Sequence, residues 1–220
     1  RMADRIKPHY AIIAGLLLLL ISAAGSARPV SYVGGWTLIE ESNRQSTAAL
    51  IHYTPSPSWS LGLRSEWVRD EDYAITSLQP TYLLKRWFGQ DYQANIYLQG
   101  GIGLASGTSG NPLSSTTAAY AGVIADWETR RFFLGYNARY VDAGHFGDNA
   151  MQLVRVGWAP YEGDTQDLHT WLMLEVDHRP ESKDPVSVTP LLRFFRGPAL
   201  LEVGFNIVDP TPLLSFTYRF

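Results

Sequence analysis

Apolar and polar side chains alternate along most of the chain, from about residue 35 to the end. In one clear case, Trp59, Leu61 and Leu63 alternate with Ser60 and Gly62. Successive side chains of an extended strand point to opposite faces, so this period of two predicts strands with one apolar and one polar face. Residues typical of turns, mainly Pro, Gly, Asp and Asn, separate the alternating segments. The pattern predicts an all-β chain.

About twelve alternating segments can be counted, and the first two are the least regular, so ten strands is the alternative. No Gly-, Ser- or Pro-rich linker and no block of charge divides them, which indicates a single domain. An even number of antiparallel strands can close into an up-and-down β-barrel. The segments lie near residues 35–42, 46–54, 59–69, 74–86, 93–105, 116–127, 131–141, 150–159, 168–178, 185–196, 199–207 and 213–220.

The last strand continues the alternation down to a final aromatic side chain. Leu214, Phe216, Tyr218 and Phe220 share one of its faces. Such an ending resembles the closing strand of bacterial outer-membrane β-barrels, where it is recognised by the barrel-insertion machinery. The resemblance implies a transmembrane barrel with apolar side chains toward lipid and lipopolysaccharide and polar side chains toward the lumen. The alternative is a secreted β-sandwich, whose outer faces would be polar.

The start of the sequence has the three parts of a secretory signal peptide. Arg5 and Lys7 precede the apolar run Ala11–Ile21, and small residues follow it. The apolar run is shorter than the roughly 20 residues that span a bilayer, which argues against the alternative of an uncleaved anchor. We therefore expect a signal peptide over residues 1–27 and an outer-membrane barrel over residues 28–220. The expected location is the outer membrane of a Gram-negative bacterium, reached through the periplasm.

An even strand count places both ends of the barrel segment on the periplasmic side. The turns near 55–57, 128–130 and 196–198 are then periplasmic, and the longer stretches 105–115 and 142–149 are external loops. Tryptophan should collect at the membrane interfaces, where one edge of its ring can stay hydrated. Trp67 falls near the outer rim. The residues expected in a periplasmic girdle are Trp36, Trp59, Trp87, Trp127 and Trp158.

Composition narrows the possible partners. The chain has no cysteine, which excludes a lipoprotein anchor, disulfides and thiolate metal sites. Removal of residues 1–27 leaves 15 basic and 20 acidic residues and a formal charge of −5, and such an acidic chain argues against nucleic acid as a partner. The glycine-rich stretch 100–103 is not followed by a helical pattern, so it is not a phosphate-binding turn, and no cofactor is expected.

Charged residues on the polar faces of the strands are the candidates for a function in the lumen. As a set they could line a narrow pore that passes small hydrophilic solutes. They could also form cross-strand ion pairs that fill and stiffen the barrel, and such pairing is expected with or without transport, because an unpaired buried charge costs several kcal/mol. The expected lumen-facing residues are Arg64, Glu66, Lys85, Asp126, Arg139, Arg155, Glu175, Asp177, Arg193, Glu202 and Arg219.

Four phrases also resemble a family of small uncharacterised envelope proteins of Gram-negative bacteria, for which no activity can be carried over. The strand number is similar to that of oligosaccharide-specific porins, but their lumens are lined by arginine, whereas the expected charges here are nearly balanced. The phrases are Tyr32-Val-Gly-Gly-Trp-Thr-Leu38, Asp126-Trp-Glu-Thr-Arg-Arg131, Asp167-Leu-His-Thr-Trp-Leu-Met-Leu174 and Val188-Thr-Pro-Leu-Leu-Arg-Phe-Phe195.

The histidines raise two other kinds of site. Asp142, His145 and Asp148 could bind a divalent metal ion, but Asp and Gly are also the residues that turns use, so a solvated loop is favoured. His52 and His169 could serve a lipid hydrolase of the outer membrane. No Gly-x-Ser-x-Gly motif supports catalysis.

The sequence therefore predicts an outer-membrane barrel that is not an enzyme. We expect a narrow, passive, porin-like channel for small hydrophilic solutes. A closed-lumen protein with a structural or assembly role is the alternative, and a lipid-modifying hydrolase is the second alternative.

Overall fold

The computed structural model describes residues 29–108, 114–164 and 166–220 of the chain. The predicted signal peptide lies outside the described residues. Within these ranges, no helix is long and apolar enough to cross a membrane. One 3-10 turn, η1, covers Gly144–Phe146. The strands are β1 (Trp36–Ser42), β2 (Ser46–Ser56), β3 (Trp59–Val68), β4 (Tyr73–Phe88), β5 (Gln93–Gly107), β6 (Ser115–Glu128), β7 (Phe132–Asp142), β8 (Asp148–Trp158), β9 (His169–His178), β10 (Val186–Arg196), β11 (Ala199–Asn206) and β12 (Thr211–Arg219).

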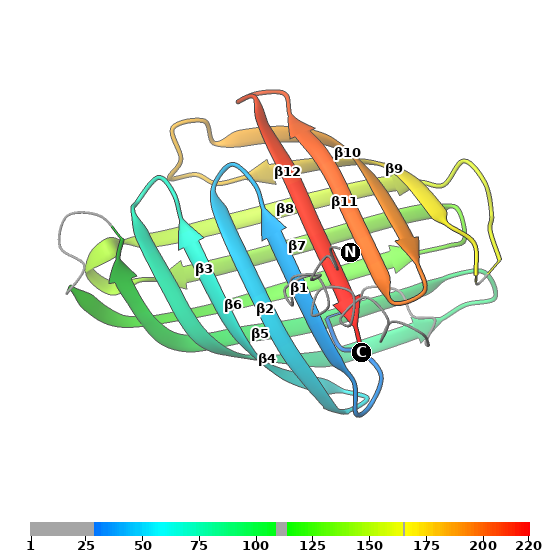
Figure 1. The fold of residues 1–220 in the computed structure, drawn as a ribbon, viewed down its shortest axis with the longest axis horizontal. Helices are drawn as coiled ribbons and strands as arrows, with labels where there is room; N and C mark the ends of the chain where they lie inside the picture. Colours follow the sequence, from blue (N-terminus) through cyan, green and yellow to red (C-terminus); the bar gives the residue numbers. More distant parts are fainter. Residues whose placement is uncertain (1–28, 109–113, 165) are drawn as a thin grey trace, which may run out of the picture.

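The strands form one closed antiparallel barrel in which each strand pairs with its neighbours in sequence and β1 pairs with β12 (Figure 1). Closure removes the unpaired edges that an open sheet would expose. The prediction of an up-and-down barrel with twelve strands is confirmed, and ten strands and the sandwich are excluded. The observed strand boundaries differ from the predicted ones by at most two residues.

Residues Leu214–Arg219 of the last strand pair with Thr37–Ser42 of the first. Leu38 faces Tyr218, and Glu40 faces Phe216, in the β1–β12 pair. The rings of Phe216, Tyr218 and Phe220 form a row on the outer wall, with centroids 6.4 and 6.1 Å apart. The aromatic side chains at the end of the sequence thus cover the seam where the barrel closes.

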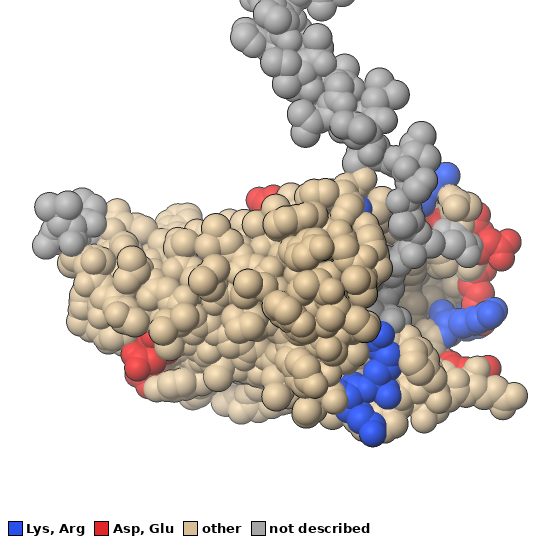
Figure 2. All heavy atoms as spheres, turned by 90° about the horizontal axis from the view of Figure 1, so that it is seen from below, with Lys and Arg blue, Asp and Glu red and all other residues tan. Residues whose placement is uncertain are grey.

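The outer wall is apolar and the inner wall is polar, the reverse of a water-soluble protein. On β3, Leu61 and Leu63 are 43% and 50% exposed, whereas Ser60 and Glu66 are 1% and 5% exposed. Figure 2 shows a wide band of the wall without charged residues, with Lys, Arg, Asp and Glu nearer its ends. An uncharged outer band is the surface that a barrel presents to hydrocarbon.

The two ends of the barrel differ in their connections. We call the end that holds 57–58, 129–131 and 197–198 the turn end, and the opposite end, which holds 69–72 and 179–185, the loop end. One turn-end connection departs from the expected short turns, because β8 and β9 are joined by residues 159–168. The expected loop 105–115 is shorter than predicted, since β5 continues to Gly107 and β6 begins at Ser115; residues 109–113 lie outside the described residues.

The tryptophan side chains follow the two ends. Trp67 is 44% exposed near the loop end. The five side chains expected in a girdle lie on the outer wall near the turn end and are 37–44% exposed; they are Trp36, Trp59, Trp87, Trp127 and Trp158.

The segment before β1 folds into the turn end of the barrel. Val30 is only 3% exposed. The hydroxyl of Ser60 donates a hydrogen bond to the carbonyl of Pro29 at 3.1 Å, and the backbone N–H of Ser31 donates to the hydroxyl of Thr54 at 3.3 Å. Because Ser60 and Thr54 are inward-facing residues of β3 and β2, this segment fills part of the turn-end mouth.

Candidate functional site

The inner wall carries most of the charged residues expected in the lumen. They come from β3, β6, β7, β8, β9, β10, β11 and β12, and all are buried or half-buried, in contrast to the exposed apolar residues beside them. The inward-facing members of the predicted set are Arg64, Glu66, Asp126, Arg139, Arg155, Glu175, Asp177, Arg193, Glu202 and Arg219.

Lys85 is the exception, and its expected place in the lumen is corrected. A β-bulge between Leu83 and Lys85 shifts the register of β4, so Lys85 pairs with Ile96 and is exposed on the outer wall. Its Nζ atom lies 5.8 Å from the ring centroid of Trp87. Arg86 takes the inward position instead and donates from Nε to Oδ1 of Asn95 at 2.6 Å.

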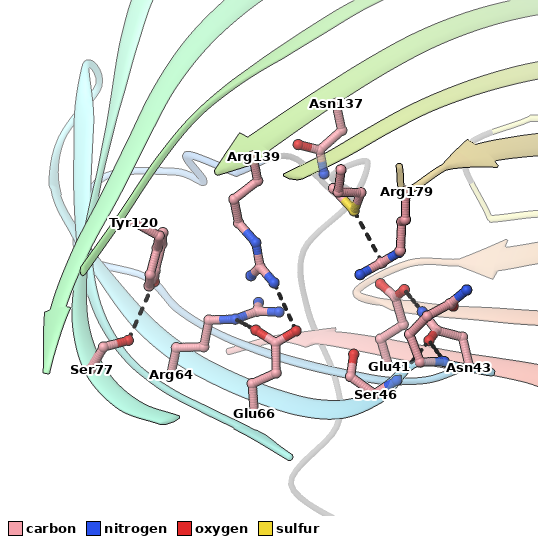
Figure 3. Close-up of polar contacts among 12 residues, drawn as sticks. Glu41, Asn43, Ser46, Arg64, Glu66, Ser77, Tyr120, Asn137, Arg139 and Arg179 are labelled. Atoms are coloured by element: carbon pink, nitrogen blue, oxygen red, sulfur yellow. Dashed lines mark hydrogen bonds and ion pairs between the residues drawn. The ribbon is translucent and has the colours of Figure 1, made fainter. Parts of the chain in front are cut away.

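One ion cluster forms around Glu66 and spans strands that are not neighbours in the sheet. Arg64 on β3 donates from Nε to Oε2 of Glu66 at 3.1 Å, and Arg139 on β7 donates from Nη2 to Oε1 at 2.8 Å (Figure 3). The Arg139 guanidinium also lies 5.4 Å from the ring centroid of Tyr120. Figure 3 shows Arg64 and Arg139 converging on Glu66 from different parts of the wall. The cluster therefore connects distant parts of the barrel across its interior.

A second ion cluster lies further toward the turn end. Arg155 on β8 binds both Glu175 on β9 and Glu202 on β11, with an Nη1 to Oε2 distance of 3.0 Å to Glu202. Arg193 on β10 donates from Nε to the other oxygen of Glu202 at 2.6 Å. Glu202 is 3% exposed and thus is a buried carboxylate held by two guanidinium groups.

Two adjoining cavities inside the barrel are lined by residues that the structure describes. The inner cavity has a volume of about 320 Å³, and its lining includes Pro29 and Arg193 near the turn end. The outer cavity has a volume of about 540 Å³, and its lining includes Asp70 and Asp184 at the loop end. Four residues line both cavities, so the two meet at this level, which we call the neck. The neck residues are Ser46, Glu66, Arg139 and Arg179.

Arg44 holds the mouth of the outer cavity together. It lies in the β1–β2 connection, and its side chain is 9% exposed. Its Nη2 atom is 3.1 Å from Oδ2 of Asp184, and its Nε atom is 2.7 Å from Oδ2 of Asp209. Because these aspartates belong to the β9–β10 and β11–β12 connections, one side chain ties three loop-end segments together.

Acidic side chains dominate the remainder of this mouth. Asp70, Glu71 and Glu181 line the outer cavity together with Lys183. Partial burial raises the pKa of the Glu71 carboxyl, and the nearby charges of Asp70 and Glu181 act in the same direction. The carboxyl of Glu71 therefore takes up a proton at a higher pH than an ordinary glutamate.

Each of the three candidate metal ligands interacts with a neighbouring group of the protein. Oδ1 of Asp142 accepts the backbone N–H of Gly144 at 2.8 Å, and Oδ2 of Asp148 accepts the hydroxyl of Tyr140 at 2.7 Å. The ring of His145 packs against Phe146 with a centroid distance of 4.3 Å. Within the described parts of the chain, no three His, Asp or Glu side chains are grouped to hold a metal ion.

The two histidines considered for catalysis face the interior. His52 is 1% exposed, lies opposite Thr37 on β1, and neither of its ring nitrogens has a hydrogen-bond partner among the described residues. His169 stacks on Phe195 with a centroid distance of 4.3 Å, and its Nε2 atom is 3.1 Å from the carbonyl oxygen of Asp164. Within the ranges that the structure describes, neither ring is hydrogen-bonded to a serine or threonine hydroxyl, the contact that an activated nucleophile requires.

Several residues of the site do not appear among the sequence-based candidates. Arg44 and Arg179 lie in connections or at a strand end, where alternation gives no facing direction. Phe133 and Phe195 are apolar residues next to outward-facing ones, yet they pack inward with Trp171 in an apolar cluster. Trp171, which pairs with Arg193, and Phe195, which lies two positions after Arg193, share the inward direction of Arg193. This shared direction would have been the available signal.

Comparison with solved structures finds several outer-membrane proteins at low sequence identity. The KdgM porin, solved in complex with disordered oligogalacturonate, is 11% identical, with coverage of 84% of this chain and 98% of that chain and a TM-score of 0.49. Acinetobacter baumannii OccAB4 is 10% identical, with coverage of 83% and 56% and a TM-score of 0.41. A loop L8 deletion mutant of the Vibrio cholerae outer membrane protein OmpT is 10% identical, with coverage of 84% and 97% and a TM-score of 0.30.

At these identities and TM-scores, the similarities assign no solute to this chain. No protein-family model matches the chain, and no curated protein matches it. The resemblance to a family of small envelope proteins therefore stays a prediction.

Proposed function

We propose that the protein is a narrow passive channel for small hydrophilic solutes in the outer membrane of a Gram-negative bacterium. The apolar outer band supports the membrane location, and the short-turn end then faces the periplasm. The proposed surroundings are outer-membrane lipid and lipopolysaccharide. The proposed route is secretion to the periplasm followed by recognition of the last strand by the insertion machinery.

One observation carries the channel proposal. The two cavities meet at a neck where three of the four lining residues are charged, Glu66, Arg139 and Arg179. A charged constriction keeps water in place and selects solutes by charge, whereas an apolar one expels water. At roughly 30 Å³ per water, the inner cavity of about 320 Å³ holds on the order of ten waters. The inner cavity is therefore small and suits single small solutes.

Conductance in planar lipid bilayers tests this proposal. The folded, signal-cleaved protein should give stable single-channel steps in KCl, and liposomes that contain it should swell in solutions of small neutral sugars. Heat-unfolded protein at the same detergent concentration is the control. Absence of steps from protein that migrates as a compact, heat-modifiable band on gels would refute the channel.

A closed-lumen structural or assembly protein is the second candidate. It is favoured by the segment before β1, where the buried Val30 and the bond from Ser60 to Pro29 hold chain inside the turn-end mouth. Cross-strand ion pairs such as those of Glu202 would then serve to stiffen the wall. Persistent silence in bilayers, together with crosslinking of the loop-end residues to another envelope component in cells, would support this role.

We propose no catalytic role. The orientation of His52 and His169 toward the interior places both rings away from the lipid on which an outer-membrane hydrolase acts. Incubation with phospholipid or lipopolysaccharide should release no fatty acid. Release that disappears in the His52→Ala or His169→Ala variant would establish the hydrolase instead.

A further inference from the structure

The inner cavity has an apolar wall that a channel for water and ions does not need. Phe133 on β7, Trp171 on β9 and Phe195 on β10 all line this cavity. They pack together with Met173 and Leu191 in one apolar cluster inside the barrel. The inner wall of a membrane barrel is ordinarily polar, because it faces water. Three aromatic side chains on one side of the cavity, which we call the aromatic wall, are therefore a departure that requires a reason.

Guanidinium groups lie beside the aromatic wall, with their carboxylate partners behind them. Arg155 and Arg193 line the inner cavity, whereas Glu175 and Glu202, which they bind, do not line it and are 5% and 3% exposed. Among the described residues, the bond from Arg193 to Glu202 uses Nε only. Its two Nη groups can therefore still donate, in the fork that matches a carboxylate.

Arg193 joins the two features. Its guanidinium carbon lies 4.8 Å from the ring centroid of Phe133, while its Nε atom binds Glu202. A carboxylate held by the free side of this guanidinium would have the rest of its molecule next to Phe133, Trp171 and Phe195. The inner cavity thus offers an anion-binding group and an apolar surface within the length of one small molecule.

Acidic residues also line the inner cavity, and their contacts determine whether the cavity prefers an anionic or a cationic ligand. Oε1 of Glu41 accepts a hydrogen bond from Nδ2 of Asn43 at 2.9 Å, Glu66 is bound by two arginines, and Oδ1 of Asp126 accepts a hydrogen bond from Nδ2 of Asn95 at 2.6 Å. Glu128, on the strand next to Phe133, also has an interaction partner. The groups most available to a ligand at the aromatic wall are therefore the two Nη groups of Arg193, because Arg155 already binds Glu175 and Glu202 through Nε and both Nη atoms.

We propose that the inner cavity binds small organic carboxylates that carry an apolar ring or chain, with the carboxylate on Arg193 and the apolar part on the aromatic wall. This inference rests on the proposed channel, for which it names the class of solute. A cavity of about 320 Å³ lies at the lower end of the range for ligand sites, roughly 300–1,000 Å³, which favours a single small acid.

Binding and current block by matched probes test the inference. The probes are 3-phenylpropionate, propionate without the ring, 3-phenylpropanol without the charge, and 2-phenylethylamine with the opposite charge. Equilibrium binding to folded protein in detergent should be at least about tenfold tighter for 3-phenylpropionate than for each of the others, since a charge-assisted hydrogen bond and an apolar contact each contribute about that factor. The same acid should block the KCl current at lower concentration than propionate.

Two variants and two matched controls locate the site. Arg193→Gln should weaken binding of 3-phenylpropionate about tenfold, and Phe195→Leu should weaken it several-fold while leaving propionate unchanged. Arg196→Gln, which changes an exposed arginine on the same strand, and Phe205→Leu, which changes an outer-wall residue that is 50% exposed, should bind like the wild type. Heat-modifiable mobility on gels verifies that each variant is folded.

The outcomes separate this inference from the channel itself. Conductance with equal binding of all four probes, or with tightest binding of 2-phenylethylamine, would overturn the carboxylate site and leave the channel standing. Preferential binding of 3-phenylpropionate without conductance would support the site and overturn the channel. The proposed location would also be overturned if the control variants weakened binding of 3-phenylpropionate as strongly as Arg193→Gln does.

Discussion

Replacement of Glu66 by glutamine removes the one carboxylate of the neck while nearly preserving its shape. Wild-type Glu66 accepts hydrogen bonds from Arg64 at 3.1 Å and Arg139 at 2.8 Å, and Arg179 lines the neck beside it. In the Glu66→Gln variant the charges of Arg64 and Arg139 face a neutral amide, while Arg179 keeps its ion pair with Asp177. We therefore expect the channel to shift from mixed selectivity toward anions.

The size of the shift follows from Coulomb's law. An ion that passes about 5 Å from the removed charge in a water-filled neck loses or gains about 0.8 kcal/mol, taking an effective dielectric constant of about 80. That energy corresponds to a factor of about 4 for each ion, in opposite directions for chloride and potassium. The chloride to potassium permeability ratio should therefore rise roughly 10- to 20-fold.

The reversal potential in a KCl gradient measures this ratio directly. The salt should stay near 0.1 M, where the Debye length of about 10 Å leaves the charge unscreened across the neck. Glu66→Asp keeps the charge and should retain wild-type selectivity. Glu40→Gln removes a carboxylate from the outer wall and is the matched control. A folded, conducting Glu66→Gln variant with wild-type selectivity would show that ions do not pass Glu66 and would refute the neck as the conduction path.

Three further changes test the wall and the mouth. Glu202→Gln leaves Arg155 and Arg193 without their shared carboxylate and should lower the free energy of unfolding, measured by urea titration in detergent, by about 3 kcal/mol; an unchanged midpoint would contradict the buried ion pairs. Gly103→Ala would place Cβ 2.0 Å from the carbonyl oxygen of Thr76 and should cost about 1–3 kcal/mol, whereas Gly100→Ala, with its nearest atom at 3.5 Å, should be nearly neutral. Val30→Asp puts a charge where the side chain is 3% exposed and should release residues 29–35 and raise the conductance, while Val33→Asp, at a position 55% exposed, should not.

The fold could be predicted from the sequence because its requirement acts on nearly every residue. Each strand must present apolar groups outward and polar groups inward. The polarity of a residue such as Leu61 or Ser60 therefore predicts the direction in which its side chain points. A bulge breaks this rule without a local signal. The alternation through Leu83 and Lys85 gives no hint of the extra residue in β4, and the expected direction of Lys85 was therefore wrong.

For the site, the sequence could predict only which side chains point into the barrel and not which of them are in contact. Glu66 and Arg139 are 73 positions apart in sequence, and their contact crosses the barrel interior between β3 and β7, which do not pair. Alternation predicts that both side chains point inward. It does not give the offset along the barrel axis between two strands that do not pair. The neck and the aromatic wall depend on the relative positions of such strands along the barrel axis, and the ion pairs of Arg44 depend on the conformation of the connections. These features therefore required the three-dimensional structure.

The distribution of apolar and charged groups inside the barrel also bears on whether the lumen is open. The interior already contains an apolar cluster near the loop end, with Tyr73 and Val141, and another near the turn end, with Trp171 and Leu191. This wall can therefore be packed with apolar groups wherever closure is needed, and replacement of buried ion pairs by apolar residues is often neutral or stabilising. The charges kept at the neck, between these clusters, are not required for closure.

A triple variant separates the two roles of those charges. Glu66→Leu combined with Arg64→Leu and Arg139→Leu removes the whole ion cluster without leaving a partner unpaired. If the cluster serves a hydrated path, the variant should unfold at an equal or higher urea concentration than the wild type and should no longer conduct, because an apolar neck expels water. Conduction that survives the substitution, or a barrel that no longer folds, would mean that the cluster serves the wall and not the passage.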